Sequence, residues 1–113
     1  MDMPVNGHDN YHAHFYFDES SRVHAQALRT SINEELGLYV GNFNTKPVGP
    51  HPQWSFQASF TADDFDVFVP WCIENRQGIS ILLHAVTGDN LIDHTEYVQW
   101  LGTPITLDLS RFK

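Results

Sequence analysis

The sequence predicts an α+β domain in which two helices pack on one face of a four-stranded antiparallel sheet. Three observations support this class. Four short segments, at residues 11–17, 38–43, 54–60 and 79–85, are rich in aromatic and β-branched residues, as strands are. Two longer segments between them carry apolar residues at helical spacing. At 113 residues, the chain has the length of one domain.

The first half of the chain predicts a strand, a helix, a strand and a long loop. Residues 1–10 hold few apolar side chains, so we expect a flexible leader before a single domain at residues 11–113. The alternating sequence YHAHFYF predicts the first strand. Ser20 or Ser21 can cap the first helix, which Gly37 ends. Its apolar positions are Val23, Ala27, Leu28, Ile32 and Leu36. Residues 44–53 hold three prolines and a glycine, which indicates a loop.

The second half continues with a strand, a helix, a strand and a C-terminal helix. Thr61 opens the second long helix after the strand at 54–60, and Pro70 should kink it. Its apolar stripe consists of Phe65, Phe68, Val69, Cys72 and Ile73. After the strand at 79–85, Asp89 caps a short helix that we expect to reach Leu101, and residues 105–109 add an edge strand.

The element order β-α-β-β-α-β is that of the ferredoxin-like fold, with strands in the spatial order 4-1-3-2. We expect strands 11–17 and 54–60 to run parallel in this sheet. The face of the sheet opposite the helices is left open. We therefore predict a homodimer in which two such faces close a dimeric α+β barrel.

Composition excludes several classes of function. Fourteen acidic and six basic residues give a net charge of −8, which argues against nucleic-acid and anionic-membrane binding. No apolar run approaches the roughly 20 residues of a membrane span, and the N-terminal segment is unlike a signal peptide. The single cysteine allows no internal disulfide, which favours a cytoplasmic location.

Histidine is the residue type that points to chemistry, because seven histidines outnumber the six lysines and arginines. His12 and His14 begin the first strand, His51 directly precedes the third, and His84 ends the fourth. With the strand directions expected above, all four converge at one edge of the sheet. A His-x-His pair on a strand directs both imidazoles to one side, about 7 Å apart. His12, His14 and His84 therefore form the predicted metal site, with His51 as the other choice for the third ligand.

The remaining histidines and the cysteine divide between functional and structural interpretations. His94 can return to the same site because the C-terminal helix begins beside the end of the fourth strand. We expect His8 in the leader and His24 on the first helix to have no functional role. Cys72 lies within an apolar stripe and is expected in the core.

Four blocks of sequence carry a resemblance to a known family: YHAHFYFDE, VGPHPQWSFQ, ISILLHAVTGD and DHTEYVQWLG. Together they span about residues 11–110 and resemble the small DOPA 4,5-dioxygenase family. The resemblance implies a ferredoxin-like dimeric barrel and extradiol cleavage of a catechol, such as DOPA or a caffeate-like compound, by non-haem Fe(II) and O₂. The family usually has proline after the histidine of the third block, where this chain has Ala85.

The resemblance also suggests roles for individual residues. His94 or His51 would move the catechol proton. The residues expected around the flat ring are Tyr11, Tyr16, Ser55 and Gln57. The blocks show no obvious carboxylate on the polar face, which implies an all-histidine site unless Asp93 or Glu96 swings in. Zinc or another divalent ion could replace iron in a purified sample.

Two other functions compete with the dioxygenase interpretation. The same fold could be a non-catalytic barrel that binds a metal or a small ligand. It could also be a cofactor-free oxygenase. The metal content of protein prepared without chelator separates these alternatives.

Overall fold

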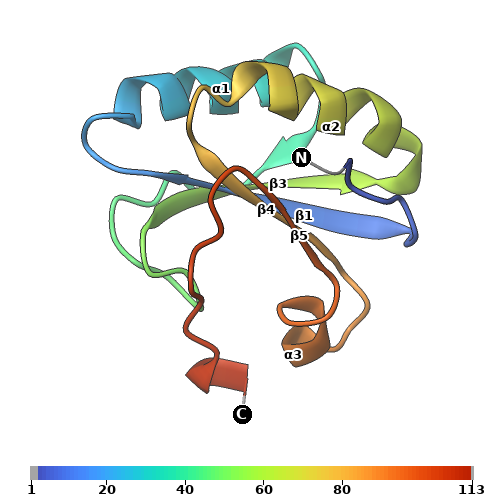
Figure 1. Ribbon diagram of the computed structural model, residues 1–113. Helices are drawn as coiled ribbons and strands as arrows, with labels where there is room; N and C mark the ends of the chain where they lie inside the picture. Colours follow the sequence, from blue (N-terminus) through green and yellow to red (C-terminus); the bar gives the residue numbers. More distant parts are fainter. Residues whose placement is uncertain (1–2, 113) are drawn as a thin grey trace.

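The computed structural model describes residues 3–112, which form an α+β fold around a five-stranded antiparallel sheet in the order β2-β3-β1-β4-β5. Helices α1 and α2 cover one face of the sheet, and α3 and the C-terminal segment lie on the other side (Figure 1). The elements in chain order are β1 (Asn10–Phe17), α1 (Arg22–Glu34), β2 (Tyr39–Val40), β3 (Trp54–Thr61), α2 (Ala62–Asn75), β4 (Ser80–Ala85), α3 (Asn90–Asp93), β5 (Val98–Leu101) and the 3₁₀ turn η1 (Ser110–Phe112).

The four predicted strands lie in the predicted order, but the expected parallel pairing of β1 with β3 is wrong. The two strands are antiparallel, with Tyr11 opposite Phe60 and Phe17 opposite Trp54. Strands alternate in direction across an antiparallel sheet, so adjacent β1 and β3 must oppose each other. The start of β3 therefore lies beside the end of β1, and the ends of β3 and β4 lie beside its start.

The C-terminal part of the chain also differs from the prediction. The helix expected from Asp89 to Leu101 is limited to α3, and residues 98–101 form β5 instead. Asp89 does cap α3, accepting a hydrogen bond from the Ile92 backbone N–H at 3.1 Å. Strand β5 then pairs antiparallel with β4, which satisfies backbone groups that an edge strand would leave unpaired. Residues 105–109 lie outside the strands, so the predicted edge strand is displaced to 98–101.

The hydrophobic core lies between the sheet and helices α1 and α2. The odd-numbered residues of β1 face the helices, and Phe15 stacks on Phe56 of β3 with ring centroids 4.6 Å apart. The helices contribute Ala25, Leu28 and Ile32 of α1 and Phe65, Phe68, Val69 and Cys72 of α2. Val23 was expected in the stripe of α1, but its side chain is 85% exposed. Helix α2 continues through Pro70 to Asn75.

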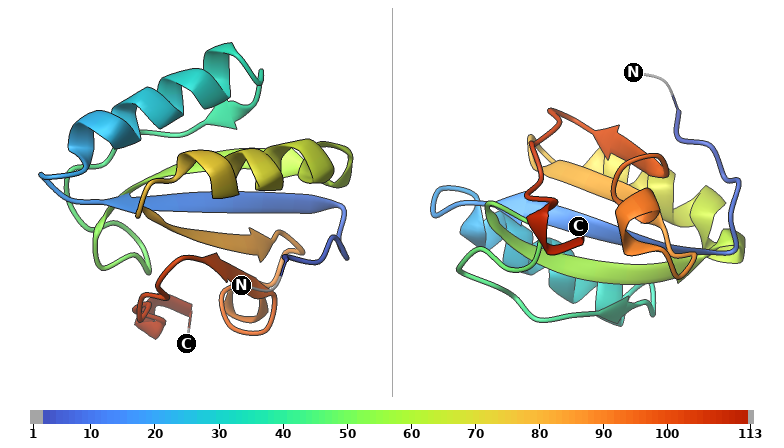
Figure 2. Two further views of the ribbon diagram at one scale, coloured as in Figure 1. Left: turned by 45° about the horizontal axis from the view of Figure 1, so that its top comes forward. Right: turned by 90° about the horizontal axis from the view of Figure 1, so that it is seen from below.

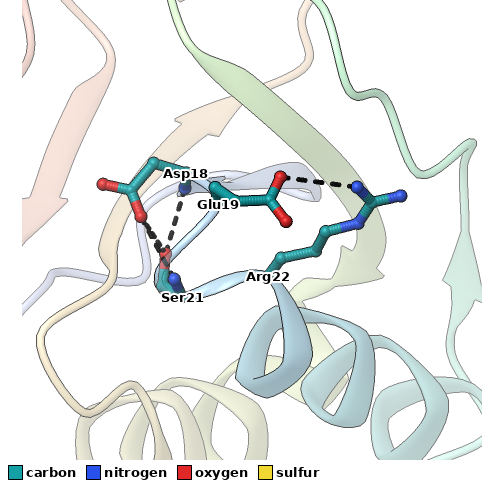
Figure 3. Close-up of polar contacts among 4 residues, drawn as sticks. All are labelled: Asp18, Glu19, Ser21 and Arg22. Carbon is teal, nitrogen blue, oxygen red and sulfur yellow. Dashed lines mark hydrogen bonds and ion pairs between the residues drawn. The ribbon is translucent and has the colours of Figure 1, made fainter.

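The turn between β1 and α1 is closed by side chains at the end of β1 away from His12 (Figure 3). The Asp18 carboxylate accepts hydrogen bonds from the backbone N–H and the hydroxyl of Ser21, and the Asp18 N–H donates to the Ser21 Oγ. Ser21 thus occupies the N-cap position but directs its side chain back to Asp18. Glu19 and Arg22 form an exposed ion pair at 3.6 Å.

The segment before β1 is hydrogen-bonded to the domain. The Val5 N–H donates to Gln99 Oε1 at 2.6 Å, and Gln99 Nε2 donates to the Val5 carbonyl at 3.0 Å. Asn6 Nδ2 donates to the Ala62 carbonyl at the start of α2. These contacts attach residues 5 and 6 to β5 and α2. No helix within residues 3–112 combines the length and the apolar character needed to cross a lipid bilayer.

Candidate functional site

Five histidines gather on the face of the sheet opposite α1 and α2, where they line one pocket of about 220 Å³. His12 and His14 belong to β1, His84 to β4, His51 to the loop before β3, and His94 directly follows α3. His12 lies opposite His84 in the pairing of β1 with β4. The right-hand view of Figure 2 shows α3 and the C-terminal segment against this side of β1 and β4. The structure thus brings together every histidine that the sequence assigned to the site.

Alternation along β1 explains why two of these histidines share a face. Successive side chains of a strand point to opposite sides, so His12, His14 and Tyr16 face away from the helices. The ring centroid of His12 lies 6.0 Å from that of His14 and 5.3 Å from that of His84. His14 and His84 are buried, whereas His12 is half-buried at the edge of the group.

His51 reaches the site by a different route from the one predicted. His51 precedes β3, and the start of β3 lies beside the end of β1, whereas His12 lies near the start of β1. The strand pairing alone would therefore keep His51 away from His12. The loop turns back on itself, with the His51 N–H donating to the Val48 carbonyl at 3.0 Å. Tyr16 Oη then lies 2.7 Å from His51 Nδ1, and the His51 ring centroid is 4.1 Å from that of His14. The loop, rather than the strand, therefore delivers this imidazole.

One contact in the site joins the nitrogens of two imidazoles directly. His14 Nε2 and His84 Nε2 are 2.9 Å apart. His84 Nδ1 lies 2.8 Å from the Ala85 carbonyl, to which it donates, so Nε2 of the neutral ring carries a lone pair. The two Nε2 atoms must then share either one proton or one cation. A metal about 2.1 Å from two nitrogens at right angles would separate them by about 3.0 Å. The spacing therefore fits a shared metal ion.

Two overlapping groups of three histidines could hold an ion. One consists of His12, His14 and His84, and the other of His14, His51 and His94; within each group the ligand atoms lie within 4.8 Å of one another. The first group is the predicted metal set. Neither group found within residues 3–112 includes a carboxylate.

The two acidic residues considered as extra ligands are placed differently from one another. Asp93 is buried, and its carboxylate accepts hydrogen bonds from the Thr87 N–H at 2.9 Å and the Thr87 hydroxyl at 2.7 Å. Glu96 is exposed and belongs to neither group of three histidines. Asp93 thus anchors the loop between β4 and α3, and the potential ligand groups among residues 3–112 consist of imidazoles alone.

Burial keeps the central histidines neutral. It lowers the pKa of His51 and of His84 to about 4, and it lowers the pKa of His14 well below the ordinary value of 6.5. The positive charges that neighbouring histidines would carry lower the pKa of His14 further. The pKa of the half-buried His12 is also lowered, first by burial and then by His94. Neutral imidazole is the form that binds a metal, so this environment suits a metal site at neutral pH.

His94 and Phe112 cover the site from the C-terminal side. His94 Nδ1 lies 2.8 Å from the Asn90 carbonyl, to which it donates, so Nε2 of the neutral ring is available to accept a proton. Its ring centroid is 4.2 Å from that of His84 and 4.8 Å from that of Phe112. No periodic pattern in the sequence points to Phe112, which lies in the short 3₁₀ turn η1. A backbone hydrogen bond from Asp108 to Pro50 joins the segment before this turn to the His51 loop.

The four residues expected around a substrate ring are dispersed. Gln57 lies opposite His14 in the sheet and lines the pocket. Tyr16 and Ser55 share this face but are buried, and the Tyr16 hydroxyl contacts His51. Tyr11 lies on the helix face, where its ring stacks on Phe60 with centroids 5.2 Å apart. Its odd position in β1 directs it away from the five histidines of the pocket, and it is not among the residues that line that pocket, contrary to the expectation.

Comparison with known proteins identifies the family. The sequence model of the Dopa 4,5-dioxygenase family matches residues 11–111, so the chain belongs to this family. A crystal structure of a candidate dioxygenase from Nostoc punctiforme superposes with a TM-score of 0.86 at 40% sequence identity. The match covers 89% of this chain and 88% of that one. Family membership supports an enzyme of the dioxygenase type, an oxidoreductase that uses oxygen and an aromatic substrate.

Two curated fungal proteins are also similar to the chain. An uncharacterized 21.2 kDa protein of Botryotinia fuckeliana is 33% identical over 100% of this chain and 67% of its own length. A DOPA 4,5-dioxygenase of Amanita muscaria is 29% identical over 88% of this chain and 48% of its own length. The chain thus spans about two thirds of the first relative and about half of the second.

Proposed function

We propose that this member of the Dopa 4,5-dioxygenase family is a metal-dependent extradiol dioxygenase that opens the ring of a catechol with O₂. The observation that carries the proposal is the pair of Nε2 atoms of His14 and His84, 2.9 Å apart in a pocket lined by three further histidines. The name of the Amanita muscaria relative directs the choice of substrate towards DOPA, and a caffeate-like catechol is the alternative.

The metal ligands in this proposal are His12, His14 and His84. Their ligand atoms lie within 4.8 Å of one another, and burial favours the neutral ring in each. Bound Fe(II) would supply Lewis acidity and open coordination positions for the catechol oxygens and O₂. The same nitrogen donors suit zinc and other divalent ions, so the donor set alone does not select iron.

The remaining residues of the pocket would handle the proton and the ring. His94 is the first choice for the acid–base residue, because its hydrogen bond to Asn90 leaves Nε2 free to take a proton from a catechol hydroxyl and return it later. His51 is the second choice. The Gln57 amide could bind a substrate oxygen, and the Phe112 ring could flank an aromatic ring that enters beside His94.

Reconstitution tests this proposal directly. Protein loaded anaerobically with Fe(II) is mixed with air-saturated catechols, and oxygen uptake and the visible absorbance of ring-opened products are followed. We expect uptake with at least one of DOPA, caffeate and unsubstituted catechol, and none with resorcinol, whose hydroxyls are not adjacent. Absence of uptake with every catechol would refute the dioxygenase assignment.

A cofactor-free oxygenase of the same fold is the second candidate, and one observation favours it. Every buried side-chain nitrogen and oxygen within the described residues has a hydrogen-bond partner without any metal. The His14–His84 contact would then be a hydrogen bond through one shared proton. Protein purified without chelator would contain no stoichiometric metal in this case, and a chelator would leave its activity unchanged.

We also infer a homodimer and retain the cytoplasmic location as a prediction. The chain itself covers part of the histidine face with α3 and the C-terminal segment (Figure 2). A second copy would pack against the remainder of that face and complete a barrel around the pockets. Sedimentation of a monomer at micromolar concentration would contradict this assembly.

A further inference from the structure

We propose that Tyr16 is a positioning residue that holds His51 in the tautomer with its hydrogen on Nε2, so that His51 donates a hydrogen bond into the pocket and does not bind the metal. The tautomer follows from contacts within this chain. Only its catalytic consequence rests on the function proposed above. The inference separates His51 from His84, which the sequence left as competing choices for the third ligand.

The contact between Tyr16 and His51 is short and buried. Tyr16 Oη lies 2.7 Å from His51 Nδ1, and each side chain is at most 6% exposed. Trp100 of β5 stacks against the Tyr16 ring with centroids 5.9 Å apart and planes at 27°. The phenol is thus held from one side by β5 and meets the imidazole on the other.

The single hydrogen of the phenol decides the direction of this bond. A phenol has an ordinary pKa of about 10, so the Tyr16 hydroxyl keeps its hydrogen at neutral pH. Among residues 3–112, His51 Nδ1 is the hydrogen-bond partner that the structure gives this hydroxyl. A hydrogen on Nδ1 would leave the phenol hydrogen without an acceptor, at a cost of about 1–3 kcal/mol. Tyr16 therefore donates to Nδ1, and the neutral ring carries its own hydrogen on Nε2.

The two buried imidazoles that flank His14, those of His84 and His51, differ in what their Nδ1 atoms face. His84 Nδ1 faces the Ala85 carbonyl, which accepts a hydrogen bond, so His84 has a bare Nε2. His51 Nδ1 faces a hydroxyl that donates, so His51 has a protonated Nε2. A metal ligand needs a lone pair, which His84 offers and His51 does not. The backbone carbonyl and the phenol thus give two neighbours of His14 opposite chemical roles.

A neutral imidazole with a fixed Nε2–H can act as an electrophilic group in the reaction. It would donate a hydrogen bond to a substrate oxygen that gains negative charge. It would not transfer its hydrogen completely, because that would leave an imidazolate ring. Proton transfer then falls to His94, whose Nε2 is bare when the ring is neutral.

Nitrogen NMR of histidine-labelled, metal-free protein tests the tautomer. Bare and protonated imidazole nitrogens have widely separated ¹⁵N shifts, and the His51→Gln variant assigns the His51 signals. We expect a protonated Nε2 and a bare Nδ1 on His51, and the reverse on His84. A protonated Nδ1 on His51 in the wild-type protein would overturn the proposal without recourse to any variant.

Two substitutions on β1 form a matched pair for the role of Tyr16. Tyr16→Phe removes the donor, and we expect the Nδ1–H tautomer of His51 to become at least as populated as the Nε2–H tautomer. Tyr11→Phe removes the hydroxyl of an equally buried residue, which bonds to the Asn6 side chain and the His8 backbone, and should leave the His51 signals unchanged. An unchanged His51 tautomer in folded Tyr16→Phe would show that Tyr16 is not the cause.

Zinc, used as a diamagnetic probe, separates this inference from the proposed metal site. On titration with Zn(II), the nitrogen signals of His12, His14 and His84 should move, and His51 should retain its Nε2–H. Loss of that hydrogen at stoichiometric Zn(II) would overturn the proposal. Failure of all histidines to respond would refute the metal site, while the metal-free spectrum would still decide the tautomer.

Discussion

The two faces of the sheet are built from the same strands and serve different ends. On the helix side, β1 contributes Ala13, Phe15 and Phe17, which pack beneath two long helices. On the other side, the same strand contributes His12, His14 and Tyr16, which are covered by α3, a loop and the C-terminal segment (Figures 1 and 2). One face is thus an apolar core, and the other is a set of buried imidazoles under irregular structure.

This difference indicates how stability and chemistry are divided within a small domain. The helix face buries aromatic rings that stack on one another, so its side chains supply most of the hydrophobic free energy. The histidine face buries groups that prefer water, and their contacts with one another fix orientation and tautomer. Substitutions on the first face should change folding, whereas substitutions on the second should change ligand binding and catalysis.

Truncating a ring on the helix face should have the largest effect on stability. Phe15 is fully buried and stacked on Phe56, so Phe15→Ala should lower the free energy of unfolding by about 3–5 kcal/mol. Urea unfolding of the metal-free protein measures this loss. Val23→Ala on the exposed side of α1 is the control and should change stability by less than about 0.5 kcal/mol. Equal losses in the two variants would contradict the assignment of the core.

Replacing the proposed acid–base residue should affect turnover without affecting the metal. His94→Gln removes the nitrogen that would take the catechol proton, and kcat should fall about 10²–10⁴-fold in the Fe(II) enzyme. Metal content should stay at the wild-type level, because His94 lies outside the group of His12, His14 and His84. His24→Gln, on α1 and remote from the pocket, should retain full turnover. A His94→Gln protein that loses its metal would place His94 among the ligands.

The histidine face should also make the metal-free protein sensitive to acid. His51 and His84 have pKa values near 4 in the folded protein and near 6.5 in the unfolded chain. Above pH 6.5 both are neutral in both states, so they do not affect folding. Between pH 6.5 and 4 the unfolded chain takes up protons that the folded protein excludes. Each group then lowers the free energy of unfolding by up to about 1.4 kcal/mol per pH unit, and the loss ends below pH 4.

Urea unfolding of chelated protein at pH 7.5, 6, 5 and 4 measures this slope. The His51→Gln/His84→Gln double variant should have a flatter profile over the same window. The lowered pKa values of His12 and His14 act in the same direction, so the double variant should keep part of the slope. The pKa of Asp18 is lowered from 3.8, so its contribution lies below the window. Identical slopes in the wild type and the double variant would show that other groups cause the acid sensitivity.

The sequence predicted the helix face better than the histidine face because regular elements leave periodic patterns. The stripe on α2 and the alternation of β1 and β3 placed most of the core and put His12 and His14 on one side. His84 followed from its place at the end of β4. Each of these predictions uses only the period of an element and the order of the strands.

The residues that close the histidine face are placed by contacts without periodicity. Asp89 and the apolar residues after it favoured a long helix, and no local signal showed that residues 98–101 would pair with β4. His51 lines the pocket with the other histidines, but a parallel pairing was invoked to place it there, and the loop contact with Tyr16 does so instead. Phe112 reaches His94 through an irregular segment that tertiary contacts position. Long-range contacts of this kind have no signature in a single sequence.

The smallest expected effect is on metal affinity, which should depend on the histidine face and not on the helix face. His14 belongs to both groups of three histidines, so His14→Ala should weaken Zn(II) or Fe(II) binding at least tenfold, or about 1.4 kcal/mol. Competition with a chromophoric chelator measures this affinity, and His24→Ala is the matched control because His24 bonds to the Asn75 carbonyl instead.

A ligand that binds only the folded state, present at 100 times its Kd, raises the free energy of unfolding by about 2.7 kcal/mol. Folded Phe15→Ala protein should keep this gain despite its lower stability, whereas His14→Ala should lose about half of it. Equal metal affinity in wild-type and His14→Ala protein would show that the metal does not bind on the histidine face, and it would favour the cofactor-free alternative.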